Sequence, residues 1–508
     1  MTISDDALPL PSAAEAFEAI PFGEEPLTAD VLMQAVLLLR TAVTGDAKRI
    51  AAHIGATPDD AAIANLAHYL ALRHHDLRPL QRELMWRGLS SLGRLESRVL
   101  PTLDAVAATL GAVTGHPSPF PAPDKTAFFA GEARLTAATD AMFGPAPAMR
   151  RTRIMVTLPS EAAGDPALVL DLARRGMDIA RINCAHDGNI AWRGMATNVR
   201  TAATVVGRDI KVLMDIAGPK IRTEAVTAPK KAKLQPGDRL RLVAGGEPRA
   251  CEAVPFSAAV SLPEMVTRLT PGDRVRYDDG KLEGVVESVA DGEAVVRVTT
   301  VKAGGTKLRP EKGLNLPDTA LGLSPLTAKD EDDLTTVIEC ADMIGYSFVS
   351  RPDDIDLLEA ALARHGTRER PLGLVAKIER PEAVTNLPAL MARALRARPF
   401  AVMIARGDLA AEIGFERLAE MQEELLWLCE AAAVPAIWAT QVLEDLVKDG
   451  VPSRGEMTDA AMAARAECVM LNKGPAVGTA IELLDHLLGR MDSHAFKKTA
   501  QLRALRSW

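Results

Sequence analysis

The sequence predicts an α/β protein: a (β/α)8 (TIM) barrel with an inserted small β-barrel lid domain and an all-α N-terminal domain. Three observations predict this fold class. After residue 150, short and continuously apolar runs alternate with amphipathic helical stretches, as buried parallel strands alternate with the helices that cover them. Between the third and fourth runs, residues 224–311 lack a helical period, and before the first run the pattern is helical throughout.

The N-terminal part has the pattern of helices from residue 12 to residue 112. Leu32, Val36 and Leu39 recur at spacings of four and three residues, which is the period of one helix face. Residues 113–125 are rich in proline and glycine, as a linker is. We expect residues 1–125 to be an all-helical extension ending in this Pro-rich linker, which could mediate oligomerisation, cover the barrel bottom, bind a partner or serve only as a packing scaffold.

The barrel itself is expected over residues 126–223 and 312–508. Most of its apolar runs are followed by a long amphipathic stretch, as in 415–432 and 476–491. Eight such units close into a (β/α)8 barrel. The eight runs are 153–157, 178–182, 211–215, 342–348, 372–378, 400–405, 435–439 and 468–471.

The interval 224–311 is expected to be the inserted lid domain. It contains Pro-Gly-Asp turns at 236–238 and 271–273, and runs such as Arg-Leu-Arg-Leu-Val with an alternating character, which are signals of hairpins and short strands. A second continuous α/β domain is the alternative, but the density of turns favours a small β domain.

Composition excludes several classes of protein. The chain has 59 Lys+Arg against 67 Asp+Glu, a net charge of −8, which argues against binding nucleic acid or an anionic membrane over the whole surface. No apolar run is long enough to span a bilayer, and the N-terminus has acids where a secretory signal has basic residues. Five widely spaced cysteines without a Cys-x-x-Cys pair are typical of a reducing compartment. We therefore expect a cytoplasmic protein without a membrane segment.

Polar residues follow the apolar runs, where a barrel of this kind carries its active site. Two carboxylates, Glu379 and Asp408, come from neighbouring strands and suit Mg²⁺ or Mn²⁺ better than zinc, while the cations suit a phosphate. Taken singly, each residue is more easily explained as a salt bridge at the barrel mouth. Convergence from five strands favours a site. The set is Arg181, Asn183, Asp215, Lys220, Arg222, Lys377, Glu379, Arg406, Gly407, Asp408, Thr440 and Gln441.

These residues stand in motifs that resemble the pyruvate kinase family. The motifs occur in the family's order over residues 150–491, which makes the ordered set far more specific than any one of them. The lid carries Asp278 and Asp279 within one of them. The motifs are Ala-Arg-Ile-Asn at 180–183 with His186, Met-Asp-Ile-Ala-Gly-Pro-Lys-Ile-Arg at 214–222, Tyr-Asp-Asp-Gly at 277–280, Lys-Gly-Leu-Asn-Leu-Pro at 312–317, Lys-Ile-Glu at 377–379, Ala-Arg-Gly-Asp-Leu at 405–409 and Ala-Thr-Gln at 439–441.

The resemblance implies phosphoryl transfer from phosphoenolpyruvate to ADP, giving pyruvate and ATP, with Mg²⁺ or Mn²⁺ as cofactor. It gives catalytic roles to Lys377, beside the transferring phosphoryl group, to Arg181, on the phosphate, and to Thr440, in or near the proton path. It also implies that Glu379 and Asp408 hold the metal. The substrate carboxylate would bind at Gly407, Asp408 and Thr440, and the nucleotide phosphates would face Asn183, His186, Arg222 and Lys312. A homo-oligomer is expected as well.

Three departures concern the monovalent cation that typical family members require. Asn183 and Asp215 are kept, but the family's Ser and Thr ligand positions are Ala185 and Ile216. The position that is Glu in K⁺-requiring members is Lys220, whose ammonium would bring a fixed positive charge. We expect that Lys220 substitutes for K⁺ and that the ion is not required.

Other departures concern the acceptor and the architecture. Asn-Lys-Gly-Pro-Ala at 472–476 replaces the family's Ser-Gly-Glu-Thr-Ala beside the nucleotide, so ADP could bind differently or another acceptor could be used. The family's C-terminal α/β domain, with its allosteric sugar-phosphate site, is expected to be absent. Two alternatives remain open: a nucleotide-independent lyase acting on oxaloacetate-like acids, and a non-catalytic metabolite sensor. Arg222, Lys312 and the lid favour the kinase.

Overall fold

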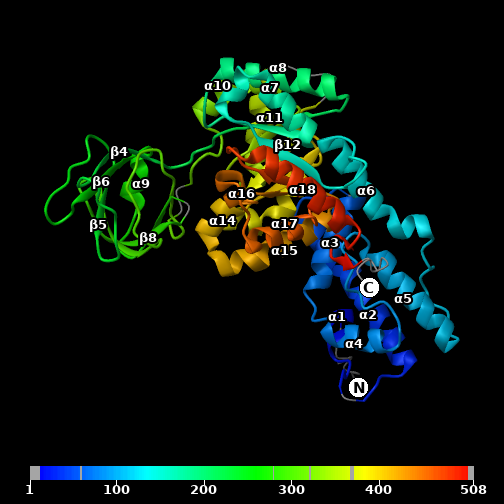
Figure 1. The fold of residues 1–508 in the computed structure, drawn as a ribbon. Helices are drawn as coiled ribbons and strands as arrows, with labels where there is room; N and C mark the ends of the chain where they lie inside the picture. The colour runs from blue at the N-terminus through cyan, green and yellow to red at the C-terminus, as the bar shows by residue number, and fades with distance from the viewer. Residues whose placement is uncertain are drawn as a thin grey trace, which may run out of the picture.

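The structure is a computed structural model that describes residues 12–23, 25–57, 60–278, 280–319, 322–365 and 371–500. Figure 1 shows a helical N-terminal region in blue to cyan, a barrel, and a green β-sheet that stands off one side of the barrel. The expected fold class is confirmed by this arrangement. Across the part of the chain that the structure describes, no helix is both long and apolar enough to cross a membrane.

The N-terminal region is built from capped helices. Thr28, Asp60 and Asp124 each accept a backbone N–H of the first turn of the helix that follows, which is how a helix start satisfies its free donors. The Pro-rich segment lies between the fifth and sixth helices. The helices are α1 (Ala13–Glu18), α2 (Ala29–His53), α3 (Ala61–Arg73), α4 (Arg78–Trp86), α5 (Val99–Thr114) and α6 (Lys125–Phe143).

Eight parallel strands form a closed barrel in which the order around the ring follows the chain, so the predicted strands are confirmed. The first strand pairs with the second, with Met155 opposite Ile179, and also with the last, with Arg153 opposite Cys468. The strands are β1 (Arg153–Thr157), β2 (Ile179–Asn183), β3 (Lys211–Asp215), β11 (Met343–Tyr346), β12 (Gly373–Ile378), β13 (Phe400–Ala405), β14 (Ala436–Ala439) and β15 (Cys468–Leu471).

Helices surround the barrel, and a small C-terminal hairpin follows them. The helical segments are η1 (Ser160–Ala163), α7 (Pro166–Arg175), α8 (Asn189–Val206), α10 (Ala328–Cys340), α11 (Pro352–Ala363), α12 (Pro381–Thr385), α13 (Leu387–Ala394), α14 (Arg406–Ile413), α15 (Phe415–Ala431), α16 (Glu444–Asp449), α17 (Arg454–Ala463) and α18 (Val477–Asp492). The hairpin pairs β16 (Ala495–Phe496) with β17 (Thr499–Ala500).

The interior of the barrel is closed at the end where the strands begin. Met142 and Phe143, the last residues of α6, belong to the same buried cluster as inward-facing strand residues such as Met155 and Met343. Gly373, at the start of β12, leaves room for this plug, because a Cβ there would lie 3.0 Å from the Met142 Sδ. The end of α6 therefore closes the barrel bottom.

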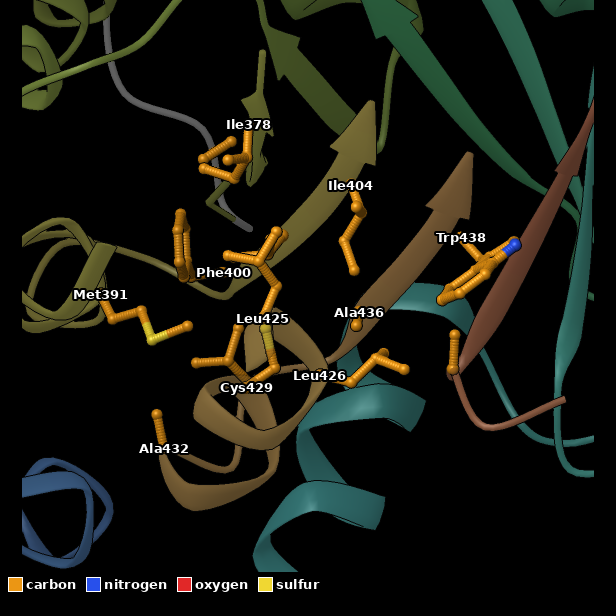
Figure 2. Close-up of a cluster of buried hydrophobic side chains, with 14 of the residues drawn as sticks. Ile378, Met391, Phe400, Ile404, Leu425, Leu426, Cys429, Ala432, Ala436 and Trp438 are labelled. Carbon is orange, nitrogen blue, oxygen red and sulfur yellow. The ribbon is translucent and has the colours of Figure 1, made fainter. Parts of the chain in front are cut away.

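The outer layer of the barrel and the N-terminal helices share one apolar core. Figure 2 shows Phe400 and Ile404 of β13 packed toward Leu425 and Cys429 of α15. Asn65 of α3 joins the two parts by hydrogen bonds, since its Nδ2 donates to the carbonyl oxygen of Ala431 at 2.8 Å and to that of Glu96 at 2.7 Å.

The inserted domain is a curled, mixed half-barrel with its own apolar core. It is continuous with the barrel through two linkers, one after β3 and one before α10. Its strand order is β10-β7-β8-β9-β5-β6-β4. The elements are β4 (Thr223–Thr227), β5 (Arg239–Val243), β6 (Phe256–Val260), α9 (Pro263–Arg268), β7 (Arg274–Tyr277), β8 (Leu282–Ala290), β9 (Glu293–Val301) and β10 (Leu314–Asn315).

Candidate active site

The candidate site lies at the carboxyl ends of the barrel strands, beside the cleft between the lid and the barrel. Asp215, the last residue of β3, is buried at the centre of the site and contacts two cationic side chains. Its Oδ2 accepts the Arg181 Nε at 2.9 Å, and its Oδ1 lies 3.4 Å from the Lys377 Nζ. Burial opposes ionisation of Asp215, but the charges of Lys377 and Arg181 outweigh it and lower the pKa of this carboxyl. Gly345 of β11 makes the space, since a Cβ there would lie 2.8 Å from the Asp215 Oδ1.

Lys377 connects Asp215 to the first metal-ligand candidate. Its Nζ lies 2.9 Å from the Glu379 Oε1 and donates to the Ser347 Oγ at 2.7 Å. Burial alone would lower the pKa of Lys377, but Asp215 and Glu379 raise it to about 12. The ammonium is therefore charged throughout the physiological range, at the bottom of the site.

Glu379 and Asp408 lie close enough that the charge of Asp408 acts on Glu379. Burial, with the Asp408 charge, raises the pKa of Glu379, while its Oε2 accepts the Phe348 N–H at 2.7 Å. Burial also opposes ionisation of Asp408, but the Lys220 ammonium 2.6 Å from its Oδ1 lowers the pKa. Two carboxylates at one place leave most of an oxygen shell to water and substrate, which fits Mg²⁺.

No cluster of three or more His, Cys, Asp or Glu side chains with metal-ligand geometry is present within the described ranges. Glu379 and Asp408 supply two carboxylates, which is only part of the oxygen shell of a divalent ion, so water or ligand oxygens would complete it. This suits a site where the metal binds together with its substrate, rather than a closed structural site.

The start of α14 is fixed against the end of β14. Gly407 donates its N–H to the Thr440 Oγ1 at 2.7 Å, and that hydroxyl donates to the Ala439 carbonyl oxygen at 2.7 Å. Arg406 forms an ion pair with Asp459, with Nη2 and Oδ2 at 2.9 Å. These contacts place the Gly407 amide, the Asp408 carboxylate and the Thr440 hydroxyl at the same edge of the barrel.

Left-handed backbone conformations cluster around this edge. Phe348, Thr440, Gln441 and Leu443 have φ angles of 58°, 65°, 56° and 48°, which side-chain-bearing residues adopt only when the surroundings enforce them. Strain of this kind is concentrated at functional sites in proteins.

The loop after β3 is pinned beside the site before it leads to the lid. The Asp330 carboxylate accepts the N–H groups of Ala217 and Gly218, at 3.0 and 3.3 Å. Gly218 has φ 63°, and a Cβ there would lie 2.7 Å from the Phe348 ring, so only glycine fits. Lys220 follows in this loop, and its ammonium forms an ion pair with the Asp408 carboxylate.

The residues expected to face a monovalent cation are otherwise engaged. The Asn183 Oδ1 accepts the Ala185 N–H at 3.1 Å, and Ile216 is a fully buried apolar side chain. Arg181 and Lys377 balance the charge of Asp215.

A second group of basic residues lies toward the base of the lid. The Lys312 Nζ lies 3.0 Å from the Asp278 Oδ1, and the Arg222 Nη1 donates to the Glu311 carbonyl oxygen at 3.1 Å. Burial lowers the pKa of His186, and the charges of Lys473 and Arg222 lower it further. Arg222 and Lys473 are thus each within electrostatic reach of His186. Asp279 lies outside the described residues.

Two clefts open beside the site. One, of about 660 Å³, lies between the lid and the barrel and is lined by Lys220, Phe348, Arg380 and Glu412 among others. The other, of about 730 Å³, is lined by Ser160 and by Lys473 in the loop after β15.

Two residues of the site were missed by sequence reasoning. Ser347 binds Lys377, and Thr157 accepts the Arg181 Nη1 at 3.0 Å. Both stand at the ends of apolar runs, so the rule that selected Arg181 and Thr440 could have found them. Ser347 was counted instead as part of the run 342–348.

Comparisons with known proteins agree with this geometry. The family model for the pyruvate kinase barrel domain matches residues 149–481. A pyruvate kinase of Mycobacterium tuberculosis is 34% identical over 332 residues, covering 65% of this chain and 66% of that protein. One of Agrobacterium vitis is 33% identical over 355 residues, covering 68% and 70%. The crystal structure of a pyruvate kinase from Cryptosporidium parvum superposes with a TM-score of 0.59 at 25% identity, covering 70% of this chain and 73% of that chain. The chain thus spans about two thirds of the length of these curated relatives.

Proposed function

Because the chain belongs to the pyruvate kinase family, we propose that it transfers the phosphoryl group of phosphoenolpyruvate to ADP, giving pyruvate and ATP. The observation that carries the proposal is the buried set of Lys377, Glu379 and Asp408 at the carboxyl ends of adjacent strands. It combines a permanently charged ammonium with two carboxylates of the kind that bind Mg²⁺.

In the proposed reaction the bond from phosphorus to the enol oxygen breaks, and a bond from phosphorus to a β-phosphate oxygen of ADP forms. The phosphoryl group is anionic throughout, so positioned cations lower the barrier. Lys377 holds its charge at the phosphoryl group, and Arg181 binds a phosphate oxygen. Glu379 and Asp408 would hold the divalent ion, which supplies charge neutralisation when bound.

The other product is an enolate whose carbon must take up a proton. Thr440 stands at this edge with its hydroxyl hydrogen-bonded to the Ala439 carbonyl and the Gly407 N–H. We place Thr440 in the proton path, through ordered water, and the Gly407 and Asp408 amides at the substrate carboxylate, where a helix start favours an anion. The carboxylate would then replace the Thr440 hydroxyl as acceptor of the Gly407 N–H.

The acceptor is expected on the side of Asn183 and of the basic residues His186, Arg222 and Lys312. Lys473 belongs to the segment 472–476, which departs from the family motif, and lies within electrostatic reach of His186. Its positive charge would therefore add to the cations that the family motifs place at the acceptor phosphates. ADP is the acceptor that we propose.

The test of this function is a lactate-dehydrogenase-coupled assay with phosphoenolpyruvate, ADP and Mg²⁺. Wild type is expected to turn over, and Lys377→Met to lose about a hundred- to a thousandfold in kcat, as removal of one charge-stabilising group does. The matched control is Lys211→Met, since its ion-paired side chain is 11% exposed against 12% for Lys377 but stands at the start of β3. The proposal is contradicted if wild type and Lys377→Met are equally inactive. Pyruvate formation without ADP points instead to a phosphatase or to the lyase alternative.

We also propose that the enzyme needs no K⁺. Support comes from the missing ligand oxygens at Ala185 and Ile216 and from an Asp215 whose charge Arg181 and Lys377 already balance. The Lys220 ammonium forms an ion pair with the Asp408 carboxylate, so its positive charge acts at the same end of the barrel as Asp215. Activity in tetramethylammonium buffer is expected to change less than about twofold on adding K⁺. A many-fold rise would contradict the proposal.

Two further proposals concern the setting of the enzyme. The five cysteines are free thiols, which supports a reducing compartment such as the cytoplasm.

We also propose that the protein forms a homo-oligomer. Sedimentation equilibrium measures its mass in solution, and a single monomeric species would contradict the proposal.

A further inference from the structure

Helix α14, which carries Asp408, is held at both ends by residues of the lid and its linker. At its start, the Lys220 Nζ donates to the Asp408 Oδ1 at 2.6 Å. At its end, the Arg276 Nη1 of β7 donates to the Ala411 carbonyl oxygen at 2.7 Å and to that of Ala410 at 3.4 Å.

The end of α14 needs an outside partner. The last carbonyls of a helix have no intrahelical donors, and here Gly414, with φ 86°, ends the helix while its N–H bonds the Ala410 oxygen at 2.9 Å. Arg276 donates to the Ala411 oxygen, and its positive charge also suits the negative end of the helix dipole. Glu283 fixes the guanidinium, with the Oε2 2.6 Å from the Nε.

A second contact from the same edge of the lid supports the first. Asn315 of β10 lies opposite Arg276 in the ladder between β10 and β7. Its Nδ2 donates to the Glu412 Oε1, also on α14, at 2.9 Å. The edge formed by β7 and β10 is therefore docked on the last turn of α14.

We propose that Arg276 is a positioning residue: by holding the end of α14 it orients Asp408 at the start, and so couples the docking of the lid to divalent-metal affinity. A helix of eight residues is marginal on its own in water, so the geometry of α14 depends on the contacts made at its two ends by Lys220 and Arg276. This inference rests on the proposed function, in which Asp408 is a metal ligand.

The coupling is reciprocal. If a docked lid strengthens metal binding, then bound metal must strengthen lid docking by the same factor. Amide hydrogen exchange in β7 and β10 of the wild type is therefore expected to slow on adding Mn²⁺, and this slowing is expected to vanish in Arg276→Ala.

The test is Mn²⁺ binding to the full-length protein without substrates, measured by electron paramagnetic resonance of free Mn²⁺. Arg276→Ala is expected to weaken binding about five- to tenfold, the effect of losing one typical hydrogen bond, and Arg276→Lys to restore part of it. The matched control is Arg241→Ala. Arg241 is also an ion-paired arginine of the lid, 19% exposed against 13% for Arg276, but pairs with Glu293 within the lid.

Kinetics give a second readout. The Mg²⁺ activation constant of Arg276→Ala is expected to rise with Mn²⁺ dissociation, while the KM for ADP changes less than about twofold. Wild-type Mn²⁺ affinity in Arg276→Ala would overturn the inference, as would equal weakening in Arg241→Ala. Mn²⁺ binding that Glu379→Gln leaves unchanged would contradict the metal site and the coupling together. Failure of phosphoryl transfer alone would contradict only the proposed function.

Discussion

Glu430, near the end of α15, shows how one residue can make stability depend on pH. Burial raises its pKa to about 7, helped by the charges of Glu96 and Glu467 and opposed by those of Lys497 and Lys498. The folded protein therefore holds a proton between pH 4.5 and 7 that the unfolded chain releases, so stability falls as pH rises through this window.

Glu430→Gln removes this dependence. At pH 8 the variant is expected to be more stable than wild type by on the order of 1 kcal/mol, whereas at pH 4.5 the difference should be near zero. Urea unfolding at both pH values measures it. Equal differences at pH 4.5 and pH 8 would show that Glu430 is ionised in the folded protein across the range.

At the scale of an element, α6 owes its place to the two residues at its end. Phe143 is 1% exposed inside the barrel bottom, and Phe129 on the same helix is 41% exposed. Phe143→Ala is expected to lower the free energy of unfolding by about 3–5 kcal/mol, as truncating a buried aromatic side chain does. Phe129→Ala is expected to cost about 1 kcal/mol or less. Chemical unfolding compares them, and similar costs would mean that α6 does not plug the barrel.

The elements also show where sequence reasoning succeeds. Runs such as 400–405 are continuously apolar because both faces of a barrel strand are buried, so local pattern predicts them. Contacts between Met142 and the barrel interior, or between Arg276 and α14, join residues far apart in the chain. No local period records such contacts, so neither the bottom plug nor the docked lid could be predicted.

The features of the site likewise divide into those that the sequence predicts and those that it does not. Lys377, Glu379, Asp408 and Thr440 follow apolar strands, so their presence at one barrel end was predictable from topology. Which ammonium meets which carboxylate was not. Lys220 is expected to replace a monovalent ion, and this stays a prediction. Its ammonium forms an ion pair with Asp408, 188 positions away in the chain, and no local pattern records such a contact.

At the scale of the whole molecule, the described residues form three apolar clusters, of which the one inside the barrel is enclosed by the outer barrel layer. The N-terminal helices and the outer barrel layer share one, and the lid has another. Because cooperativity follows shared packing, we expect two calorimetric transitions. Leu240→Ala, in the lid core, should lower the midpoint temperature of only one transition. Leu425→Ala, in the shared core, should lower the midpoint temperature of only the other. A single transition that both variants lower equally would contradict this division.

The pairing of β1 with β15 has a consequence for synthesis of the protein on the ribosome. The ring closes only through the ladder that joins Arg153 to Cys468, so more than three hundred residues must emerge before β1 gains its second neighbour. Until then the unpaired edge of β1 is open to other chains. The preceding helix α6 is already made by that time, and its end at Phe143 gives the growing strands an apolar surface on which to collect.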